Sequence, residues 1–344
     1  MALSVVVPTL GHSSQLADCL EALRQAAEAC RDEVEIILVV PEGLDPSQIP
    51  CLQRNPAPLS AVGRIVTVDR PGFSAAVNTG FEASDSDLLA TVNDDAVVDP
   101  AWLEELVGAL ADQRLGAVQG VHRRFDAPGK LDGYGIGWNR WCQAVQLGHG
   151  RPLGEAPGEP VEIFGVSATA AVYRRQALLD ARSPSVVGSF FDEALFAYYE
   201  DVDLAARLHA AGSMALCRPS AGAVHVGSVS GRRLPFGGRR LIHGNRHLIL
   251  ARLLGRSFWR RWPRIAARDL IDGSRALIAG DLSGAVGIAA GQLRALRRLP
   301  RFAHLGEAYV DLRHWTESGQ SAYYGSLRHA QSPDDDTSSW TPLP

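Results

Sequence analysis

Two short acidic clusters and one histidine have the residue types and the spacing of a chemical site. The first cluster is Asn93, Asp94 and Asp95, which directly follows the apolar run 88–92. Two adjacent carboxylates that face a crevice repel each other and lose hydration, and a divalent cation held against a phosphate would relieve both costs. An Asx-rich turn before the helix expected near residue 100 would use the same residues without a ligand. Both interpretations are open at this point.

The second cluster, Glu200, Asp201 and Asp203, begins a helix that the apolar spacing predicts over 204–211. Carboxylates at a helix start interact with the helix dipole and cap free amides, which accounts for Asp203. Glu200 and Asp201 follow the aromatic run 195–199, which indicates a partly buried position where an extra carboxylate is costly. An aspartate held in such a place could act as a general base.

The histidine is His225, which closes a short apolar run and precedes a loop of small residues. A single histidine is more often a hydrogen-bonded structural residue than a ligand. Together with Asp94 and Asp95, however, His225 could complete a metal site.

The elements that would position these residues alternate between strand and helix. Apolar runs predict strands, and helical spacing predicts the helices between them; the strands are 3–7, 34–40, 65–68 and 88–92, and the helices 13–31, 75–81 and 102–110. This order is typical of a doubly wound, open and mostly parallel α/β sheet, which binds ligands outside the carboxyl ends of its strands.

Polar residues stand at four of these strand ends: Pro8 with Thr9, Glu42, Arg70, and residues 93–95. Four ordinary surface turns would look the same, but each of these ends is followed by a helix whose amino terminus favours an anion. Farther along, residues 123–162 lack a clear period and are expected to form a long irregular excursion. Residues 161–173 are expected to form one strand, and 174–179 a helix.

Size and composition limit the classes of protein that fit. The 344 residues suffice for one large α/β domain with an appendage. The 34 basic and 38 acidic residues, a net charge of −4, do not indicate a nucleic-acid-binding protein. Five scattered cysteines show no zinc-site spacing and are expected to be reduced thiols. No basic leader, long apolar stretch or cleavage site opens the sequence, so we expect a cytoplasmic location.

Four blocks of the sequence are similar, in their order and spacing, to the motifs of one known family. Residues 5–9 resemble an opening nucleotide-binding strand, 72–80 a Gly-Phe-x-x-Ala-x-Asn-x-Gly block, 93–95 an Asp-x-Asp motif, and 191–204 an acceptor-side Glu-Asp block followed by His225. Together they resemble the inverting family 2 glycosyltransferases with the GT-A fold, and within these a rhamnosyltransferase-like subgroup.

This resemblance implies a role for each matching residue. Asp95, with Asp94, would hold Mg²⁺ or Mn²⁺ on the donor diphosphate, and His225 would add a metal ligand or a phosphate contact. Asp201 would take the proton from the acceptor hydroxyl, and Glu200 would orient the acceptor or the base. The donor would contact the remaining motif residues, namely Pro8, Thr9, Glu42, Arg70, Gly72, Asn78, Asn93 and Asp94.

Two departures from the family pattern affect these roles. Glu42 stands where many relatives carry an aspartate that reads the base, and Asn93 replaces the first aspartate of the Asp-x-Asp motif. The second change leaves one carboxylate fewer for the cation.

The composition changes sharply at residue 232, beyond which arginines accumulate among Leu, Ile and Trp. We divide the chain into a GT-A catalytic domain at 1–231, with a donor half at about 1–121 and an acceptor half at about 122–231, a helical Arg-rich region at 232–331, and a disordered tail at 332–344. Basic amphipathic helices with boundary tryptophans suit an anionic membrane surface. A solvated face packed on the catalytic domain, or a dimer contact, would give the same composition. No module that stacks on nucleic-acid bases is recognisable.

The sequence as a whole therefore predicts a metal-dependent inverting glycosyltransferase, peripheral at the inner face of the cell membrane. The donor would be a nucleotide-diphosphate sugar such as dTDP-rhamnose, and the acceptor a polyprenol-linked or polysaccharide glycan of the cell envelope. A sugar nucleotidyltransferase, or a catalytically silent binding subunit of a glycan-assembly complex, is the alternative.

Overall fold

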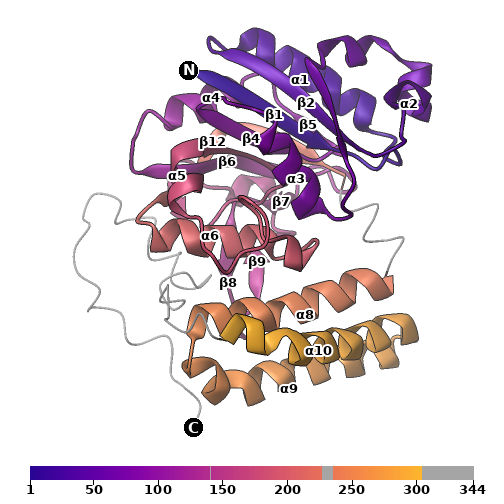
Figure 1. Ribbon diagram of the computed structural model, residues 1–344, viewed down its shortest axis with the longest axis vertical. Coiled ribbons are helices and arrows are strands. Elements are labelled where there is room, and N and C mark those ends of the chain that lie inside the picture. The colour runs from indigo at the N-terminus through magenta and orange to yellow at the C-terminus, as the bar shows by residue number, and fades with distance from the viewer. Residues whose placement is uncertain (140, 227–234, 304–344) are drawn as a thin grey trace.

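The computed structural model describes residues 1–139, 141–226 and 235–303, and these form a central sheet with helices on both faces and a helical unit at one end (Figure 1). The sheet has ten strands. Eight follow one another in space, in the order β10 (Val161–Ile163), β12 (Met214–His225), β6 (Leu115–Arg124), β11 (Ala170–Arg174), β4 (Leu88–Val92), β1 (Ala2–Pro8), β2 (Glu33–Pro41) and β3 (Arg64–Val68).

Two further strands extend the sheet, and a separate hairpin lies beside it. β5 (Ala96–Val98) pairs with β12, and β7 (Leu131–Gly133) pairs with β6. The hairpin consists of β8 (Ile136–Trp138) and β9 (Ala144–Gln146). The prediction of a long irregular excursion at 123–162 is thus wrong in part, because β6 continues to Arg124 and three short strands follow it. Each of these strands has only three residues, too few to show a period in the sequence.

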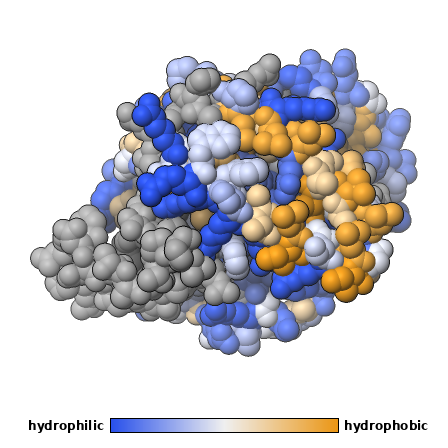
Figure 2. Space-filling model, turned by 90° about the horizontal axis from the view of Figure 1, so that it is seen from below, coloured by the Kyte–Doolittle hydropathy of each residue, from blue (hydrophilic) through white to orange (hydrophobic). Residues whose placement is uncertain are grey.

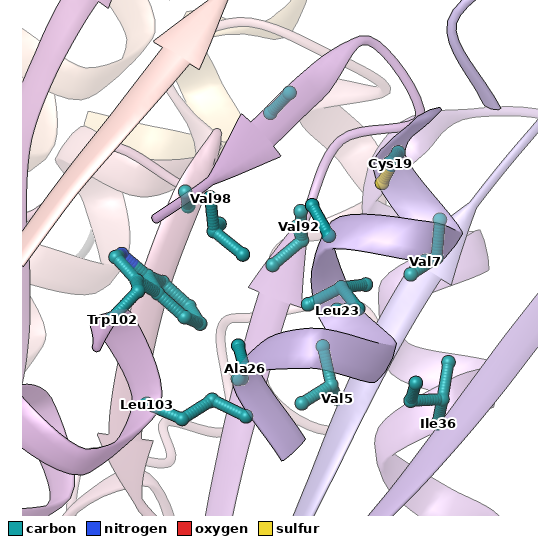
Figure 3. Packing of buried hydrophobic residues seen from close by; sticks show 14 of the residues in the cluster. Val5, Val7, Cys19, Leu23, Ala26, Ile36, Val92, Val98, Trp102 and Leu103 are labelled. Atoms are coloured by element: carbon teal, nitrogen blue, oxygen red, sulfur yellow. The ribbon is translucent and has the colours of Figure 1, made fainter. Parts of the chain in front are cut away.

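The helices cover the sheet from both sides because alternate residues of each buried strand point to opposite faces. The helices of the sheet are α1 (Leu16–Ala29), α2 (Pro50–Arg54), α3 (Phe73–Glu82), α4 (Trp102–Ala109), α5 (Arg175–Asp180) and α6 (Glu200–Ala210). Figure 3 shows the first face, where Leu23 of α1 and Trp102 of α4 pack with Val5 and Val7 of β1.

The opposite face uses the intervening residue Val6, which belongs to a second core with Phe81 of α3 and Leu208 of α6. A strand segment that is buried on both faces is mostly apolar, which is why residues 5–7 and 36–40 show no polar alternation. Full burial of each such side chain contributes about 1.5–3 kcal/mol to stability.

The strands β4, β1, β2 and β3 are parallel neighbours, so their carboxyl ends meet at one edge of the sheet. This confirms the four strands predicted there and places Thr9, Glu42, Arg70 and residues 93–95 along that edge. The fold class expected from the sequence, an open and mostly parallel α/β sheet with flanking and C-terminal helices, is confirmed.

The prediction of a single strand at 161–173 is wrong, since these residues form two strands in different parts of the sheet. β10 pairs with β12, whereas β11 runs antiparallel between β6 and β4. The chain turns between them, where a Cβ atom on Gly165 would lie 2.3 Å from the Cβ of Ala205 and the amide of Ser167 donates to Gln119 Oε1 (2.6 Å). An apolar run in the sequence does not show such a turn.

Three long helices follow the sheet, namely α8 (Pro235–Leu254), α9 (Ser257–Ile278) and α10 (Leu282–Ala303). They share one hydrophobic core with the part of the chain that forms the sheet and its hairpin, in which Leu248 and Phe258 lie with Trp138 and Tyr199. The expected helical Arg-rich region is therefore present to residue 303. The expected boundary at 231/232, the rest of that region and the tail at 332–344 lie outside the described residues. None of the helices described has the length and apolar character to cross a membrane.

Candidate active site

The donor-side cluster lies where β4 ends, beside the end of the neighbouring strand β1. Thr9 Oγ1 donates to Asp94 Oδ2 (2.5 Å), and Ser13 Oγ donates to the Asp94 carbonyl (2.9 Å). Burial, together with the charge of Asp95, raises the pKa of Asp94 to about 6, although the hydrogen bond from Thr9 opposes this. A cation or a phosphate-bound metal near this carboxylate would favour its charged form.

The pairing of β5 with β12 brings Asp95 and His225 together. His225 lies opposite Ala96 in this register, and the amide of Val226 donates to the Asp95 carbonyl (3.1 Å). His225 Nε2 is then 3.5 Å from Asp95 Oδ1. The other ring nitrogen, Nδ1, lies 2.7 Å from Asp132 Oδ2, because β7 pairs with β6 beside β12.

The electrostatics of this histidine follow from its two carboxylate neighbours. Burial disfavours the charged ring, but Asp132 and Asp95 together raise the pKa of His225 to about 9. An imidazole that is oriented through one nitrogen by a carboxylate, and presents the other to a second carboxylate, is the arrangement by which proteins hold metal-binding histidines. At 3.5 Å the protonated Nε2 makes at most a long hydrogen bond to Asp95 Oδ1, and a bound cation would have to displace this proton before the two atoms could act as neighbouring ligands.

The donor set therefore fits a divalent cation bound mainly by a diphosphate. Mg²⁺ is commonly held by one or two protein groups together with substrate phosphates. Asp95 and His225 supply two such groups, and the buried Oδ1 of Asn93 has no hydrogen-bond partner. Asp94 hydrogen-bonds to Thr9 instead of completing a compact trio with them, so its part in holding the cation stays a prediction.

A compact trio of possible ligands does occur elsewhere among residues 1–139, 141–226 and 235–303. The ligand atoms of His243, Asp269 and Asp272 all lie within 4.8 Å of one another. Arg246 donates to Asp269 Oδ1 (2.7 Å), and His247 Nε2 lies 2.5 Å from Asp269 Oδ2. The guanidinium already compensates the buried carboxylate, so this trio is better explained as an ion-paired link between α8 and α9 than as a metal site.

The acceptor-side cluster begins α6. Asp201 is partly exposed, and its Oδ1 accepts from the Val202 amide (2.8 Å). Burial raises its pKa to about 6, although the amides of Val202 and Ala168 oppose this. Glu200 is buried, its Oε2 has no hydrogen-bond partner, and burial together with Asp201 raises its pKa well above the ordinary value. A carboxylate with a pKa near 6 is suited to accept a proton near neutral pH.

The turn at residues 168–169 joins the two sides of the site. The amide of Ala168 contributes to the environment of the Asp201 carboxylate. The next residue, Thr169, accepts a hydrogen bond through its carbonyl from the Asn93 amide (2.8 Å). The donor cluster and the acceptor cluster are therefore neighbours, although more than one hundred residues separate them in the sequence.

A strained loop precedes the acceptor cluster. Phe196, Tyr198 and Tyr199 all have positive φ angles (71°, 65° and 69°), which non-glycine residues rarely adopt. Phe196 packs on Gly72, where an added Cβ would lie 3.0 Å from its ring, and its carbonyl accepts from the Ser74 amide (3.2 Å). Strain of this kind concentrates at functional sites.

The other residues that were predicted to contact the sugar donor either hold the loop before Glu200 or lie at the carboxyl edge of the sheet. Arg70 pairs with Glu193 (2.6 Å), and Asn78 is buried, with its side chain bonded to Phe191 and to Glu193. Glu42 is exposed. The structure thus gives Asn78 and Arg70 a clear structural role, while donor contacts for them, as for Pro8, Thr9, Glu42 and Gly72, stay predictions.

Other residues support the site in ways that the sequence did not indicate. Asp132 orients His225, and no local signal marks it because it lies in a stretch without period. Asp203 does not cap the helix as expected. It is fully buried and ion-paired with Arg207 (2.9 Å) and with Arg252 of α8. Arg252 also pairs with the buried Asp192 (2.9 Å).

Asn245 of α8 is a further residue of this kind, since its side-chain amide holds the strained loop. Its Nδ2 donates to three loop carbonyls, and its Oδ1 accepts from Arg294; the carbonyls are those of Leu195 (3.0 Å), Ala197 (3.0 Å) and Tyr198 (2.7 Å). The loop before Glu200 is therefore fixed from the C-terminal helices.

We expect Asn245→Ala to loosen this loop without unfolding the sheet. Loss of these hydrogen bonds leaves buried carbonyls unpaired at about 1–3 kcal/mol. Hydrogen exchange at residues 195–203, followed by mass spectrometry, should become about ten-fold faster or more, whereas exchange in β1 and β4 should not change. The control is Gln25→Ala on the exposed side of α1. Unaltered exchange at 195–203 would show that α8 does not hold the loop.

Comparison with known proteins agrees with this arrangement. Residues 4–180, just over half of the chain, match the family described as Glycosyl transferase family 2, and the chain belongs to this family. The putative glycosyltransferase EpsH of Bacillus subtilis is 24% identical over 129 residues, which are 38% of this chain and 36% of that protein. The match thus spans about a third of this curated relative.

Two solved structures align with much of this chain at low similarity. TarS of S. aureus aligns with 75% of this chain and 44% of its own, at 15% identity and a TM-score of 0.46. The mannosyltransferase PcManGT of Pyrobaculum calidifontis, solved with GDP-Man and Mn²⁺, aligns with 92% of this chain and 86% of its own, at 17% identity and a TM-score of 0.49.

Proposed function

We propose that this protein is an inverting glycosyltransferase that moves a sugar from a nucleotide-diphosphate donor to an acceptor hydroxyl. The observation that carries the proposal is the contact of both acidic clusters with the turn at 168–169. On one side of that turn Asp95 and His225 offer two ligand atoms at the ligand-binding edge of the sheet. On the other side Asp201 has a pKa raised to about 6. Family membership supports the same reaction.

Each group has a definite task in this proposal. Asp201 accepts the proton of the acceptor hydroxyl as that oxygen attacks the anomeric carbon, on the face opposite the diphosphate. Glu200, buried against the base, orients it. Asp95 and His225 would hold Mg²⁺ or Mn²⁺, whose charge stabilises the leaving diphosphate. Asp132 keeps the His225 ring in place.

The finer assignments are part of the proposal and rest on the motif resemblance. The subgroup it indicates uses a rhamnose donor such as dTDP-rhamnose, with a polyprenol-linked or polysaccharide acceptor in envelope glycan synthesis. We also propose that the protein works at the inner face of the membrane as a peripheral enzyme. The arginine-rich helices α8 to α10 support this location.

A thermal-shift screen of nucleotide sugars, with and without Mn²⁺, tests the donor site. A ligand present at about 100 times its Kd stabilises the folded state by about 2.7 kcal/mol. We expect a shift with one nucleotide sugar that needs Mn²⁺ and disappears in Asp95→Asn. The matched control is Asp85→Asn, an exposed aspartate just before β4 at the opposite edge of the sheet.

Two results would contradict the proposal. If the thermal shift were the same in EDTA, or in Asp95→Asn, Asp95 would not hold a cation that donor binding requires. Turnover of a nucleoside triphosphate with a sugar phosphate, in place of sugar transfer, would identify a nucleotidyltransferase.

A further inference from the structure

The outward faces of α9 and α10 expose a row of large apolar side chains. On α10 these recur at intervals of three and four residues, as Leu282, Val286, Leu293 and Leu296, with Ala289 between them. This spacing places them along one side of the helix. Leu282 is 65% exposed and the other three are about half exposed. A helix whose apolar side faces outward has nothing to bury that side against in the described chain.

The neighbouring helix α9 continues the same surface. Its exposed apolar residues include Leu270, Ile271, Leu277 and Ile278, and Ile278 is 88% exposed. Figure 2, which looks at the molecule from the side of the C-terminal helices, shows hydrophobic residues gathered over much of this face, with hydrophilic residues around and between them. Large apolar side chains that gather on an exposed face mark sites of interaction with proteins or membranes. We call these eight residues of α9 and α10 the apolar face.

The charge of the same helices is strongly positive. Residues 235–303 contain fourteen arginines and three aspartates, and neither lysine nor glutamate, which gives a net charge of +11 with neutral histidines. The whole chain carries −4, so the charges are segregated along it. Some arginines, such as Arg246 and Arg252, are buried in ion pairs. Others are exposed on α9 and α10 or directly before α9, namely Arg256, Arg260, Arg275, Arg297 and Arg298.

We infer that the apolar face of α9 and α10 docks on the surface of an anionic phospholipid bilayer. The leucines and isoleucines would enter the boundary between headgroups and acyl chains, and the exposed arginines would contact lipid phosphates. The negative potential of such a surface attracts each basic side chain near it. Face-to-face contact with a second copy would instead bring two strongly positive surfaces together, and a nucleic acid would leave the leucines uncovered.

This inference deepens the proposed location, but its surface is independent of the sugar-transfer chemistry. Binding of the full chain to sonicated vesicles, measured by co-sedimentation, tests it. We expect binding to vesicles with 30 mol% phosphatidylglycerol to exceed binding to pure phosphatidylcholine by at least ten-fold, and to weaken as salt rises from 0.05 to 0.5 M.

The double variant Ile278→Gln with Leu282→Gln should bind anionic vesicles at least ten-fold more weakly. Both side chains are largely exposed, so the fold should tolerate the change. The control is Ile65→Gln with Val187→Gln, which alters two exposed apolar residues outside the C-terminal helices and should bind as the unaltered chain does. The Mn²⁺-dependent thermal shift with nucleotide sugar should be the same in all three proteins, which separates this inference from the donor site.

Several results would overturn the inference. Equal binding to neutral and anionic vesicles, or undiminished binding by the double variant, would show that this face does not contact lipid. Light scattering could instead show a dimer that the double variant does not form and that vesicles do not dissociate. That result would assign the apolar face to contact with a second copy of the chain.

Discussion

Asp201→Asn is expected to abolish most sugar transfer while the protein stays folded and binds its donor. General base catalysis typically contributes a factor of about 10²–10⁴, and an amide cannot accept the proton. Asparagine has nearly the same shape and can still accept the hydrogen bond from Val202. The loss should therefore appear in kcat, measured by release of nucleoside diphosphate from the nucleotide sugar that the screen identifies, and the donor-induced thermal shift should persist.

The pH profile gives a second readout of the same residue. The base must be deprotonated, and burial raises the pKa of Asp201 to about 6. The rate should accordingly rise with pH up to about 6 and then level off, and this limb should be missing from the residual activity of Asp201→Asn. Asp180→Asn, an exposed aspartate at the end of α5, is the control. Near-normal kcat in Asp201→Asn would rule Asp201 out as the base.

Arg252→Met is expected to have the largest effect on stability. Arg252 is almost fully buried and pairs with Asp192 and Asp203, both of which are completely buried. Removing one partner of a buried ion pair costs about 3–5 kcal/mol, because a charge is left uncompensated. Urea unfolding followed by tryptophan fluorescence should show the loss as a lower midpoint.

A double variant separates this explanation from loss of packing. With Asp192→Asn added to Arg252→Met, Asp192 no longer carries an unpaired charge, and Asp203 keeps its ion pair with Arg207, so much of the stability should return. Arg275→Met, whose side chain is 68% exposed and pairs only weakly with Asp272, should change stability by about 0.5 kcal/mol or less. A double variant as unstable as Arg252→Met would mean that packing of the arginine, and not its charge, stabilises this region.

The parallel half of the sheet could be predicted from the sequence because its signals are local. Strands buried on both faces are continuously apolar, and each is followed by a helix with clear spacing. The position of Asp95 followed from its place after such a strand. Its closeness to His225 was suggested by chemistry and is confirmed by the pairing of β5 with β12.

The other half could not be predicted because it depends on contacts between distant residues. β11 lies between β6 and β4 and runs against both, and nothing in residues 161–173 indicates where this run divides. Asp132 gains its role only through the register of β7 on β6. Asp203 looks like a helix-start carboxylate until Arg252, 49 residues away, is placed beside it.

The attachment of α8 to the catalytic half limits how this protein could be rebuilt. Asn245 holds the loop before Glu200, and Arg252 joins Asp192 to Asp203. A chimaera that joined this sheet to the C-terminal helices of another family member would gain a new outward surface on those helices but lose the support of the loop before Glu200. Exchange of surface properties within such an enzyme therefore has to leave α8 in place and alter only the outward sides of α9 and α10.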